Sequence, residues 1–349
     1  MSESDPAIPT VIRDVEHLEE LLSRPTPGVV ESMGRLDGDI IVLGVGGKMG
    51  PTLAHMAVRG SEAAGIKRRV IGVSRFSSGS LQEELNRDGV ETIRCDLLDA
   101  DAVAALPAAK NVVFMAGMKF GTTGKESMTW IMNTVMPGAV ARRYAGSRMV
   151  VFSTGNVYPL TPADSGGARE SDQPGPIGEY AASCLGRERV FQYYADELNS
   201  PTAIIRLNYA VEMRYGVLVD LARKIHEGQP IDLAMGYANV IWQTDANAMI
   251  LRSLDHVSVP AAIFNVVGPE TISVRKSCLR LGELLGKPVD FVGEEARDAL
   301  LSNGSLGYEK LGQTTVDADH MMQWIADWIL KDGQTLGKPT HFESRDGKF

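Results

Sequence analysis

Short apolar runs alternate with amphipathic segments from Asp39 to about residue 210. Each run is bounded by glycine, aspartate or serine, as is typical of strands buried on both faces of a parallel sheet. The runs read DIIVLGV, RVIGVSR, VETIRCD, NVVFMAG, RMVVFST and TAIIRLN, and AIFNVVGPE follows near residue 262. The pattern predicts an α/β fold with a doubly wound parallel sheet.

The remaining segments predict additions to this sheet. Residues 1–38 predict a helical extension, because VIRDVEHLEELLSR places apolar side chains on one helical face: Val11, Val15, Leu18, Leu21 and Leu22. We expect parts of 237–270 to complete the sheet. Residues 211–236 and 271–330 predict a smaller, mostly helical lid that binds substrate. The last residues, 331–349, are polar and aperiodic, which predicts a tail that is ordered only if something holds it.

Composition narrows the classes of partner. The net charge is −9 and the sequence pI is about 5.3, so we expect a small-molecule partner and neither nucleic acid nor a membrane surface. The start, MSESDPAIPT, shows no export signal, and no long apolar run follows. The cysteines form no C-x-x-C pair and the histidines no H-x-x-H pair, which predicts a reduced, cytoplasmic protein without a metal site.

A glycine-rich turn follows the first predicted strand. In GVGGKMG the glycines let the backbone approach a pyrophosphate, whose charge lies at the start of the next helix. The turn therefore predicts the dinucleotide site of a Rossmann sheet. The residues assigned to it are Gly44, Gly46, Gly47, Lys48, Met49 and Gly50.

The end of the second predicted strand bears on the choice of cofactor. An acid at this position binds the adenosine ribose in NAD proteins, but here Ser74 and Arg75 take its place. Arginine suits a 2′-phosphate, which favours NADP over NAD, although Arg75 stacked on adenine is the alternative. Asp96 after the third strand is expected either to accept from the adenine amino group or to cap the following helix.

The order of motifs over residues 39–330 resembles the extended short-chain dehydrogenase/reductase family, also called the NAD-dependent epimerase/dehydratase family. The matching segments are GVGGKMG, CDLLD, VVFMAGMK, IMNTV, STGNVYP, Tyr180, NVIWQTDAN and FNVVGPETISV. The resemblance implies that Thr154 hydrogen-bonds the reacting hydroxyl or carbonyl while Tyr180 exchanges its proton. It also implies cofactor contacts at Leu97, Ala116, Gly117, Lys119, Asn133 and Tyr180.

The sequence departs from the family at Cys184. In the family a lysine four residues after the tyrosine stabilises the phenolate, and a neutral thiol cannot do so. Three interpretations remain open. Lys119 or Arg187 substitutes for the cation, Tyr180 acts mainly as the acid in ketone reduction, or the chemistry is lost and the fold is a silent dinucleotide-binding regulator. Cys184 as a nucleophile is a fourth, weaker hypothesis.

The substrate is less clearly indicated. The segments GYANVIWQTD and RLNYAVEMRYG depart from the pattern of nucleotide-sugar members, so the sequence favours a free sugar, sugar acid or lactone. The residues assigned to the substrate are Thr154, Asn156, Asn208, Tyr209, Arg214 and Gln243, and Arg214 is either a carboxylate clamp or a surface residue.

A homodimer is also expected. The segment SMTWIMNTVMPGAVARRYAG and the Tyr180 helix resemble the helices that form the dimer contact in the family. Their apolar side chains suit such a contact, with ordinary core packing as the alternative. These residues are Met128, Ile131, Met132, Val135 and Met136.

Overall fold

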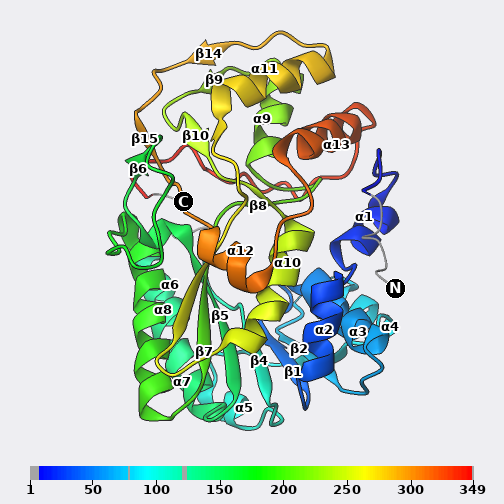
Figure 1. Ribbon diagram of the computed structural model, residues 1–349, viewed down its shortest axis with the longest axis vertical. Helices are drawn as coiled ribbons and strands as arrows, with labels where there is room; N and C mark the ends of the chain where they lie inside the picture. Colours follow the sequence, from blue (N-terminus) through cyan, green and yellow to red (C-terminus); the bar gives the residue numbers. More distant parts are fainter. Residues whose placement is uncertain (1–7, 78, 120–123, 348–349) are drawn as a thin grey trace.

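A seven-stranded parallel sheet forms the centre of the computed structural model, which describes residues 8–77, 79–119 and 124–347 (Figure 1). The strand order is β12-β7-β5-β4-β1-β2-β3. The strands are β1 (Ile40–Leu43), β2 (Val70–Ser74), β3 (Glu91–Arg94), β4 (Asn111–Phe114), β5 (Arg148–Thr154), β7 (Thr202–Leu207) and β12 (Ala262–Val266). The predicted doubly wound fold is confirmed, and each strand lies within one of the apolar runs of the sequence.

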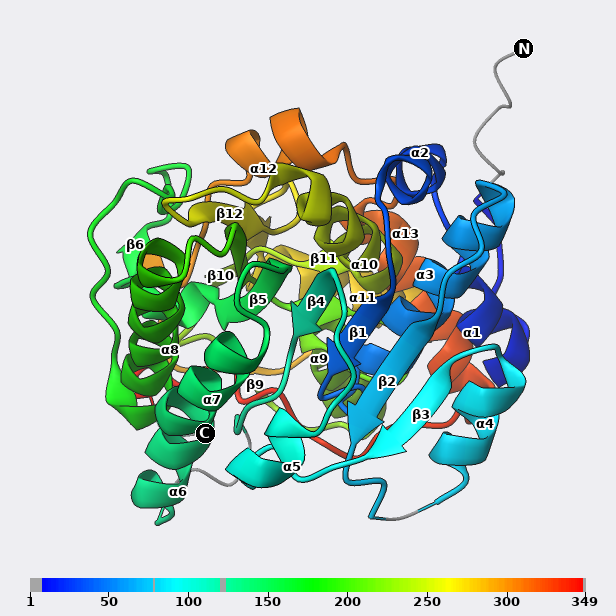
Figure 2. The same cartoon turned by 90° about the horizontal axis from the view of Figure 1, so that it is seen from below.

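Alternate residues of β1 enter two separate cores, one on each face of the sheet. Ile40 and Val42 pack with α2, α3 and α10, whereas Ile41 and Leu43 pack with α5 and α7 (Figure 2). The helices of this layer are α2 (Pro27–Arg35), α3 (Gly50–Ala63), α4 (Leu81–Arg87), α5 (Ala100–Ala104), α6 (Glu126–Trp130), α7 (Met136–Arg143), α8 (Gly178–Glu197) and α10 (Gln243–Arg252). The chain reverses strand order between β1 and β4, which is where α/β sheets bind their ligands.

The N-terminal extension contributes to two hydrophobic cores, one in the second layer, called the lid core, and one on a face of the sheet. Its first helix, α1 (Val15–Leu22), begins after Asp14, whose carboxylate accepts the His17 N–H, so the helix is shorter than the predicted amphipathic segment. Leu18, Leu21 and Leu22 are buried in the lid core. Val29 and Met33 of α2 belong to the core on the Ile40 face of the sheet. The extension therefore bridges the two parts of the molecule.

A second layer covers the carboxyl edge of the sheet. It contains α9 (Val217–His226), α11 (Val274–Leu285) and α13 (Ala318–Leu330), which share one hydrophobic core, whereas α12 (Ser305–Leu311) packs against α10 and β12 of the sheet layer (Figure 1). Short strand pairs complete it: β8 (Ala210–Val211) with β11 (Ile241–Trp242), β9 (Ile231–Asp232) with β14 (Phe291–Val292), β10 (Tyr237–Ala238) with β13 (Ile272–Ser273), and β6 (Thr161–Pro162) with β15 (Asp298–Ala299). Of the 237–270 segment, only β12 joins the main sheet.

A buried ion pair fixes α8 to the sheet. The guanidinium of Arg206 on β7 donates to both carboxylate oxygens of Glu188 on α8, at 3.0 and 2.8 Å, and to the Tyr158 hydroxyl at 2.7 Å. Ser153 at the end of β5 donates to the same carboxylate. Because a buried charge left alone is very unfavourable, this network holds the middle of α8 against β7 and the end of β5.

Exposed apolar side chains lie on α6, on the turn after it and on α8. They are Met128, Trp130, Ile131, Val135 and Tyr193. Of the residues expected at a dimer contact, Met136 is instead buried in the core. The homodimer stays a prediction, which light scattering would decide.

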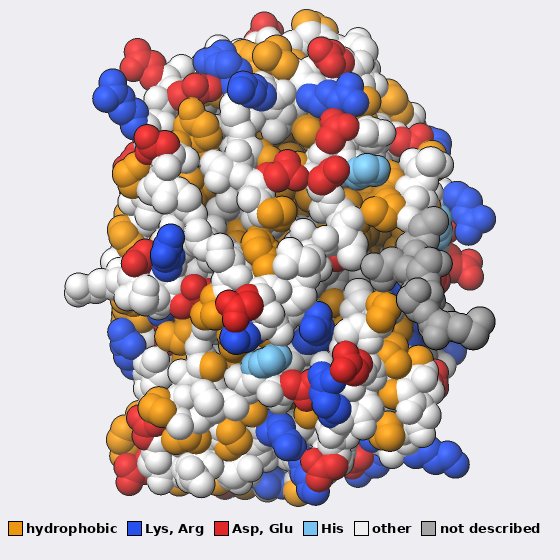
Figure 3. All heavy atoms as spheres, viewed as in Figure 1, with side chains coloured by type: hydrophobic (Ala, Val, Ile, Leu, Met, Phe, Trp, Pro, Cys, Tyr) orange, Lys and Arg blue, Asp and Glu red, His pale blue; other side chains and the backbone are white. Residues whose placement is uncertain are grey.

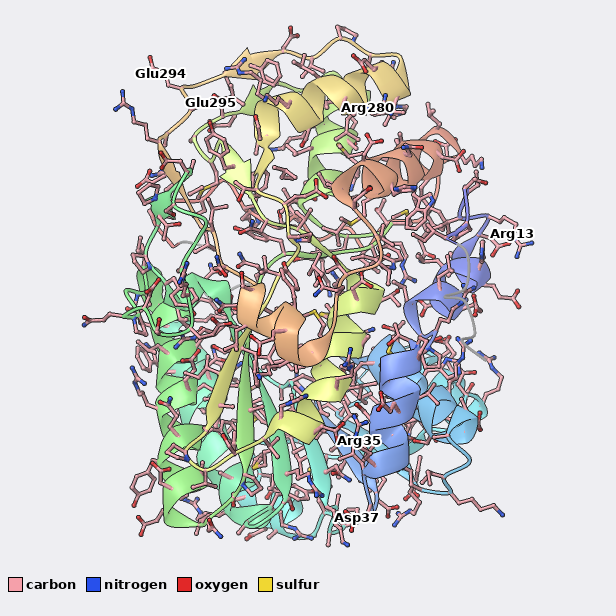
Figure 4. All side chains as sticks on the ribbon, viewed as in Figure 1. Arg13, Arg35, Asp37, Arg280, Glu294 and Glu295 are labelled. Atoms are coloured by element: carbon pink, nitrogen blue, oxygen red, sulfur yellow. The ribbon has the colours of Figure 1, made fainter. Side chains whose placement is uncertain are left out.

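Basic and acidic side chains are interspersed over the face shown in Figure 3. The charged side chains labelled in Figure 4 lie at the periphery of the molecule, with Arg280, Glu294 and Glu295 on the lid, Arg13 at the side beside α1, and Arg35 and Asp37 on the sheet layer. No helix in the described part of the chain is long and apolar enough to cross a membrane. The candidate chemistry is concentrated instead between the two layers.

Candidate active site

The glycine turn between β1 and α3 packs against neighbouring backbone too closely for a side chain at two of its positions. Gly44 has a φ of +93°, and a Cβ there would lie 2.7 Å from the backbone of Ala116. A Cβ on Gly50 would lie 2.2 Å from the carbonyl oxygen of Val45. The turn also leads directly into the first N–H groups of α3. These features fit the pyrophosphate of a dinucleotide.

A cavity of about 480 Å³ extends from this turn towards the ends of β2 and β3. The predicted cofactor residues that line it are Gly44, Gly46, Gly47, Ser74, Arg75, Asp96, Leu97, Ala116 and Gly117. The helix-cap alternative for Asp96 is wrong, since Asp99 caps α5 by accepting the N–H groups of Asp101 and Ala102. The carboxylate of Asp96 accepts the Leu98 N–H at 3.1 Å and borders the cavity.

A second cavity, of about 240 Å³, adjoins the first one and shares Gly47, Met115 and Gly117 with it. It lies over the carboxyl end of β5. Thr154, Tyr180, Lys119 and Lys48 line it, as does Met49. The structure thus brings together the cofactor turn and the predicted proton-transfer pair.

Tyr180 lies in the first turn of α8 and its side chain is almost fully buried. The phenol is hydrogen-bonded to Thr154 and to Cys184. Burial raises the pKa of Tyr180 well above 10, and the nearby Cys184 raises it further, while the Arg187 guanidinium lowers it. Tyr180 therefore carries its proton at neutral pH.

Thr154 and Cys184 are hydrogen-bond partners of the Tyr180 hydroxyl. The Thr154 hydroxyl donates to Oδ1 of Asn156 at 3.1 Å, and the Asn156 N–H donates back to Thr154 at 3.2 Å. Burial raises the pKa of the Cys184 thiol, so the thiol is neutral. A neutral, buried thiol gives no support to the hypothesis that Cys184 is a nucleophile.

Arg187 supplies the positive charge that lowers the pKa of Tyr180. It lies two turns after Tyr180 on α8, and its Nη1 donates to the Phe152 carbonyl at 2.9 Å. Its Nη2 donates to Oδ1 of Asn133. A Cβ on Gly117 would lie 2.2 Å from Nη2, so a side chain there would displace the Arg187 guanidinium. Nε of Arg187 is buried and has no hydrogen-bond partner within the described chain, which leaves a donor beside the cavity.

Asn133 lies in a π-helical turn, Ile131–Val135, between α6 and α7. Its amide exchanges hydrogen bonds with the backbone of Met118, at 3.0 and 3.1 Å, and also donates to the Ser183 hydroxyl at 2.9 Å. π-Helical turns are frequent at functional sites. This turn fixes the loop that carries Gly117 and Lys119.

Two lysines face the same cavity. Nζ of Lys48 donates to the Ala210 carbonyl at 2.9 Å and lies 4.0 Å from the centre of the Tyr215 ring. Burial lowers the pKa of Lys48 to about 7 and that of Lys119 to about 8. Lys119 acts electrostatically on Cys184, whereas the cation that affects the Tyr180 pKa is Arg187.

The other substrate candidates are dispersed. Tyr209 lines the cavity of Tyr180, and Asn156 lies with Tyr209 at a smaller neighbouring cavity. Arg214 does not line either, because it is paired with Glu212 at 3.1 Å and with Glu19 of the extension at 2.6 Å. The remaining two, Asn208 beside Gly155 and Gln243 donating to Thr52, are buried away from the cavity lining.

Sequence reasoning missed several lining residues. Tyr215, Gly216 and Val217 border the cavity of Tyr180 at the start of α9, and Thr340 reaches it from the C-terminal segment. Lys338 of the same segment lines the larger cavity. No motif marks these positions, because their places depend on how the lid returns to the sheet. The Gly-Lys-Pro composition around Lys338 predicts only an irregular segment.

The sheet topology and the paired cavities at its carboxyl edge define a doubly wound α/β protein with its candidate site at the reversal of strand order. The model of the NAD dependent epimerase/dehydratase family matches residues 40–266. The chain belongs to this family. The resemblance found in the sequence is thereby confirmed, and so is the expectation of an NAD-dependent enzyme of the epimerase or dehydrogenase type.

Solved structures agree with this fold. UDP-glucose 4-epimerase of Thermotoga maritima with UDP-glucose has a TM-score of 0.70 at 16% identity, over 84% of this chain and 99% of that one. UDP-glucose 4-epimerase of Thermus thermophilus with NAD has a TM-score of 0.67 at 19% identity, over 83% and 98%.

A mutant UDP-glucuronic acid 4-epimerase of Bacillus cereus, in complex with a fluorinated UDP-sugar acid and NAD, has a TM-score of 0.69 at 17% identity, over 84% and 99%. No curated protein sequence matches the chain. At these identities the structural neighbours support the fold alone, and the substrate has to be argued from the side chains of this chain.

Proposed function

We propose that the protein transfers hydride between a nicotinamide dinucleotide and a carbohydrate-like alcohol or ketone, with Tyr180 as the proton-transfer residue. The observation that carries this proposal is the Tyr180–Thr154 pair in a buried cavity that adjoins the glycine-turn cavity. A bound dinucleotide supplies the hydride donor or acceptor. The chain supplies the proton at the Tyr180 hydroxyl, Thr154 orients the reacting oxygen, and Asn156 holds the Thr154 hydroxyl.

The protonated state of Tyr180 favours the reductive direction. A neutral phenol can donate its proton to a carbonyl oxygen as negative charge develops there, whereas abstraction of an alcohol proton requires phenolate. The raised pKa of Tyr180 makes phenolate scarce at neutral pH. Arg187 lowers the pKa of Tyr180, as the missing family lysine would, but this pKa stays above its usual value.

NADP is the proposed cofactor, on the strength of Arg75 and Ser74 at the end of β2 beside the larger cavity. Arg75→Asp should reverse the preference, because a carboxylate repels a 2′-phosphate and accepts from a 2′-hydroxyl. Titration of NADPH and NADH fluorescence measures this. Arg87→Asp, an exposed arginine at the end of α4, is the matched control. Tighter NADH binding by the native protein would contradict the preference.

The substrate we propose carries an acidic group, such as a sugar acid. Lys48, Lys119 and Arg187 line the cavity of Tyr180, and no carboxylate side chain borders it among the described residues. A neighbouring cavity next to Tyr209 holds only about 30 Å³, room for little more than a water molecule, because Ser344, Arg345 and Gly347 border it. This confinement favours a free sugar acid over a nucleotide sugar.

Proton uptake tests the acidic substrate. At pH 8 Lys48, with a pKa of about 7, is mostly neutral in the free protein and Lys119, with a pKa of about 8, is about half protonated. A bound anion favours the charged lysines, so binding should take up protons at pH 8, and affinity should fall as pH rises from about 7 to 9. Calorimetry of cofactor-saturated protein in buffers of different ionisation enthalpy measures the uptake.

The controls separate the alternatives. Lys48→Met should reduce the uptake, and a neutral aldose should cause none. A nucleotide sugar that binds more tightly than every free sugar acid would contradict the proposed substrate class. A protein that binds the cofactor but converts no compound of a panel of sugars, sugar acids, lactones and nucleotide sugars would instead support the silent regulator.

A further inference from the structure

The C-terminal segment is held against the body of the molecule rather than forming a free polar tail. After α13 it runs back between the lid and the sheet layer, as the red segment of Figure 1. The Leu336 N–H donates to the Arg214 carbonyl at 3.0 Å. The Thr340 N–H and hydroxyl both donate to the Asp220 carboxylate on α9, at 2.7 and 2.6 Å. We call residues 334–347 the C-terminal strap.

The second half of the strap is held more firmly. Phe342 is buried in the lid core. The guanidinium of Arg345 donates to the Asp298 carbonyl at 2.9 Å and to its carboxylate at 2.5 Å. A Cβ on Gly178, at the start of the Tyr180 helix, would lie 2.5 Å from the Gly347 carbonyl oxygen, so the strap ends directly against α8. Specific contacts therefore hold the strap to the lid, at Asp220, and against the start of α8, at Gly178.

Between these anchors lies a short exposed bridge, residues 337–339. Lys338 in its centre lines the larger cavity together with Ser74, Arg75 and the glycine turn. Thr340, the next anchor, lines the cavity of Tyr180. The strap thus touches both halves of the proposed cofactor site, and it brings a cation to the half where the phosphates of a dinucleotide would lie.

We propose that the C-terminal strap holds the bound dinucleotide in place and that Lys338 binds one of its phosphate groups. This rests on the proposed cofactor site. A lysine ammonium on a flexible stem is a good partner for phosphate, and the anchors at Leu336 and Thr340 hold the bridge that carries Lys338 beside the larger cavity. The structural neighbours align with about 84% of the chain, so part of this chain has no counterpart in them.

Lys338→Ala tests the contact. We expect NADPH to bind about three- to tenfold more weakly, with a smaller dependence on salt, as for a charged hydrogen bond at a partly exposed site. NADH distinguishes the phosphates. If Lys338 binds the pyrophosphate, both cofactors weaken equally, and if it binds the 2′-phosphate, only NADPH does. Lys331→Ala, at the exposed end of α13, is the matched control and should bind as the native protein does.

Hydrogen exchange of the native protein provides a second test that needs no variant. Saturating NADPH should slow amide exchange in peptides covering 334–347, where the Leu336 and Thr340 N–H groups are hydrogen-bonded. Unchanged exchange together with unchanged affinity of Lys338→Ala would overturn the strap while leaving cofactor binding intact. Failure of the native protein to bind either dinucleotide would overturn both proposals.

Discussion

Tyr180→Phe should reduce turnover by about 10²- to 10⁴-fold, the usual contribution of a positioned proton donor. The substitution removes the only group of this side chain that can exchange a proton and leaves the ring in place. The cofactor cavity is lined by other residues, so NADPH affinity should be retained. Steady-state rates with the most active compound of the substrate panel, combined with fluorescence titration of the cofactor, measure both quantities.

A matched control lies on the same helix. Tyr193 is exposed on α8, and Tyr193→Phe should keep native turnover. If Tyr180→Phe turned over as fast as the native protein, the assignment of the proton to Tyr180 would be refuted, and Lys48 or Lys119 would become the leading donors because both line the same cavity.

Arg187→Met should slow alcohol oxidation at pH 7 at least about tenfold, because each unit of increase in the Tyr180 pKa removes a factor of ten of phenolate. Ketone reduction starts from the neutral phenol and should fall less. The variant also leaves Oδ1 of Asn133 without this donor, so a thermal unfolding curve must show that the fold persists. The pH profile of oxidation, displaced to higher pH, distinguishes an electrostatic role from a loss of packing.

Restoring the family lysine completes this test. Cys184→Lys in the Arg187→Met protein should recover part of the oxidation rate, since the new ammonium lies one helical turn from Tyr180. In the native protein the same substitution should bring no gain, because Arg187 and Lys119 already act on this position and like charges disfavour a third. A tenfold gain from Cys184→Lys alone would show that the native site lacks an adequate cation.

The sheet was predictable from sequence because its signal is local. An apolar run bounded by turn residues marks a buried parallel strand without knowledge of its neighbours, and the glycine turn identifies the strand that meets the cofactor. The Thr154–Tyr180 pair was predictable because the segments that carry it resemble the family's motifs, not because a local pattern shows its chemistry. Arg187 was accessible through helical periodicity, as it lies two turns after Tyr180 on α8.

The rest of the site depends on contacts between distant segments. Arg214 was assigned to substrate by its place after β7, but Glu19 of the N-terminal extension pairs with it. Nothing near Arg214 in the sequence indicates that partner. Lys338 and Thr340 are likewise brought to the cavities by the return of the strap across the lid. Local sequence patterns do not indicate such pairings. Whether a pairing forms depends on the entropy lost in closing the loop between its two segments and on the free energy gained when they pack.

The lid core has a consequence for the order in which the chain can fold during synthesis. It joins Ile12 and Leu18 to Phe342, which follows them after the whole central sheet has been completed in the sequence. The strands of the sheet are complete once Val266 has been made, whereas the lid core lacks a member until Phe342 has been made. Until Phe342 has been made, the apolar face of α1 therefore lacks part of its core, and folding chaperones can bind this face during that period.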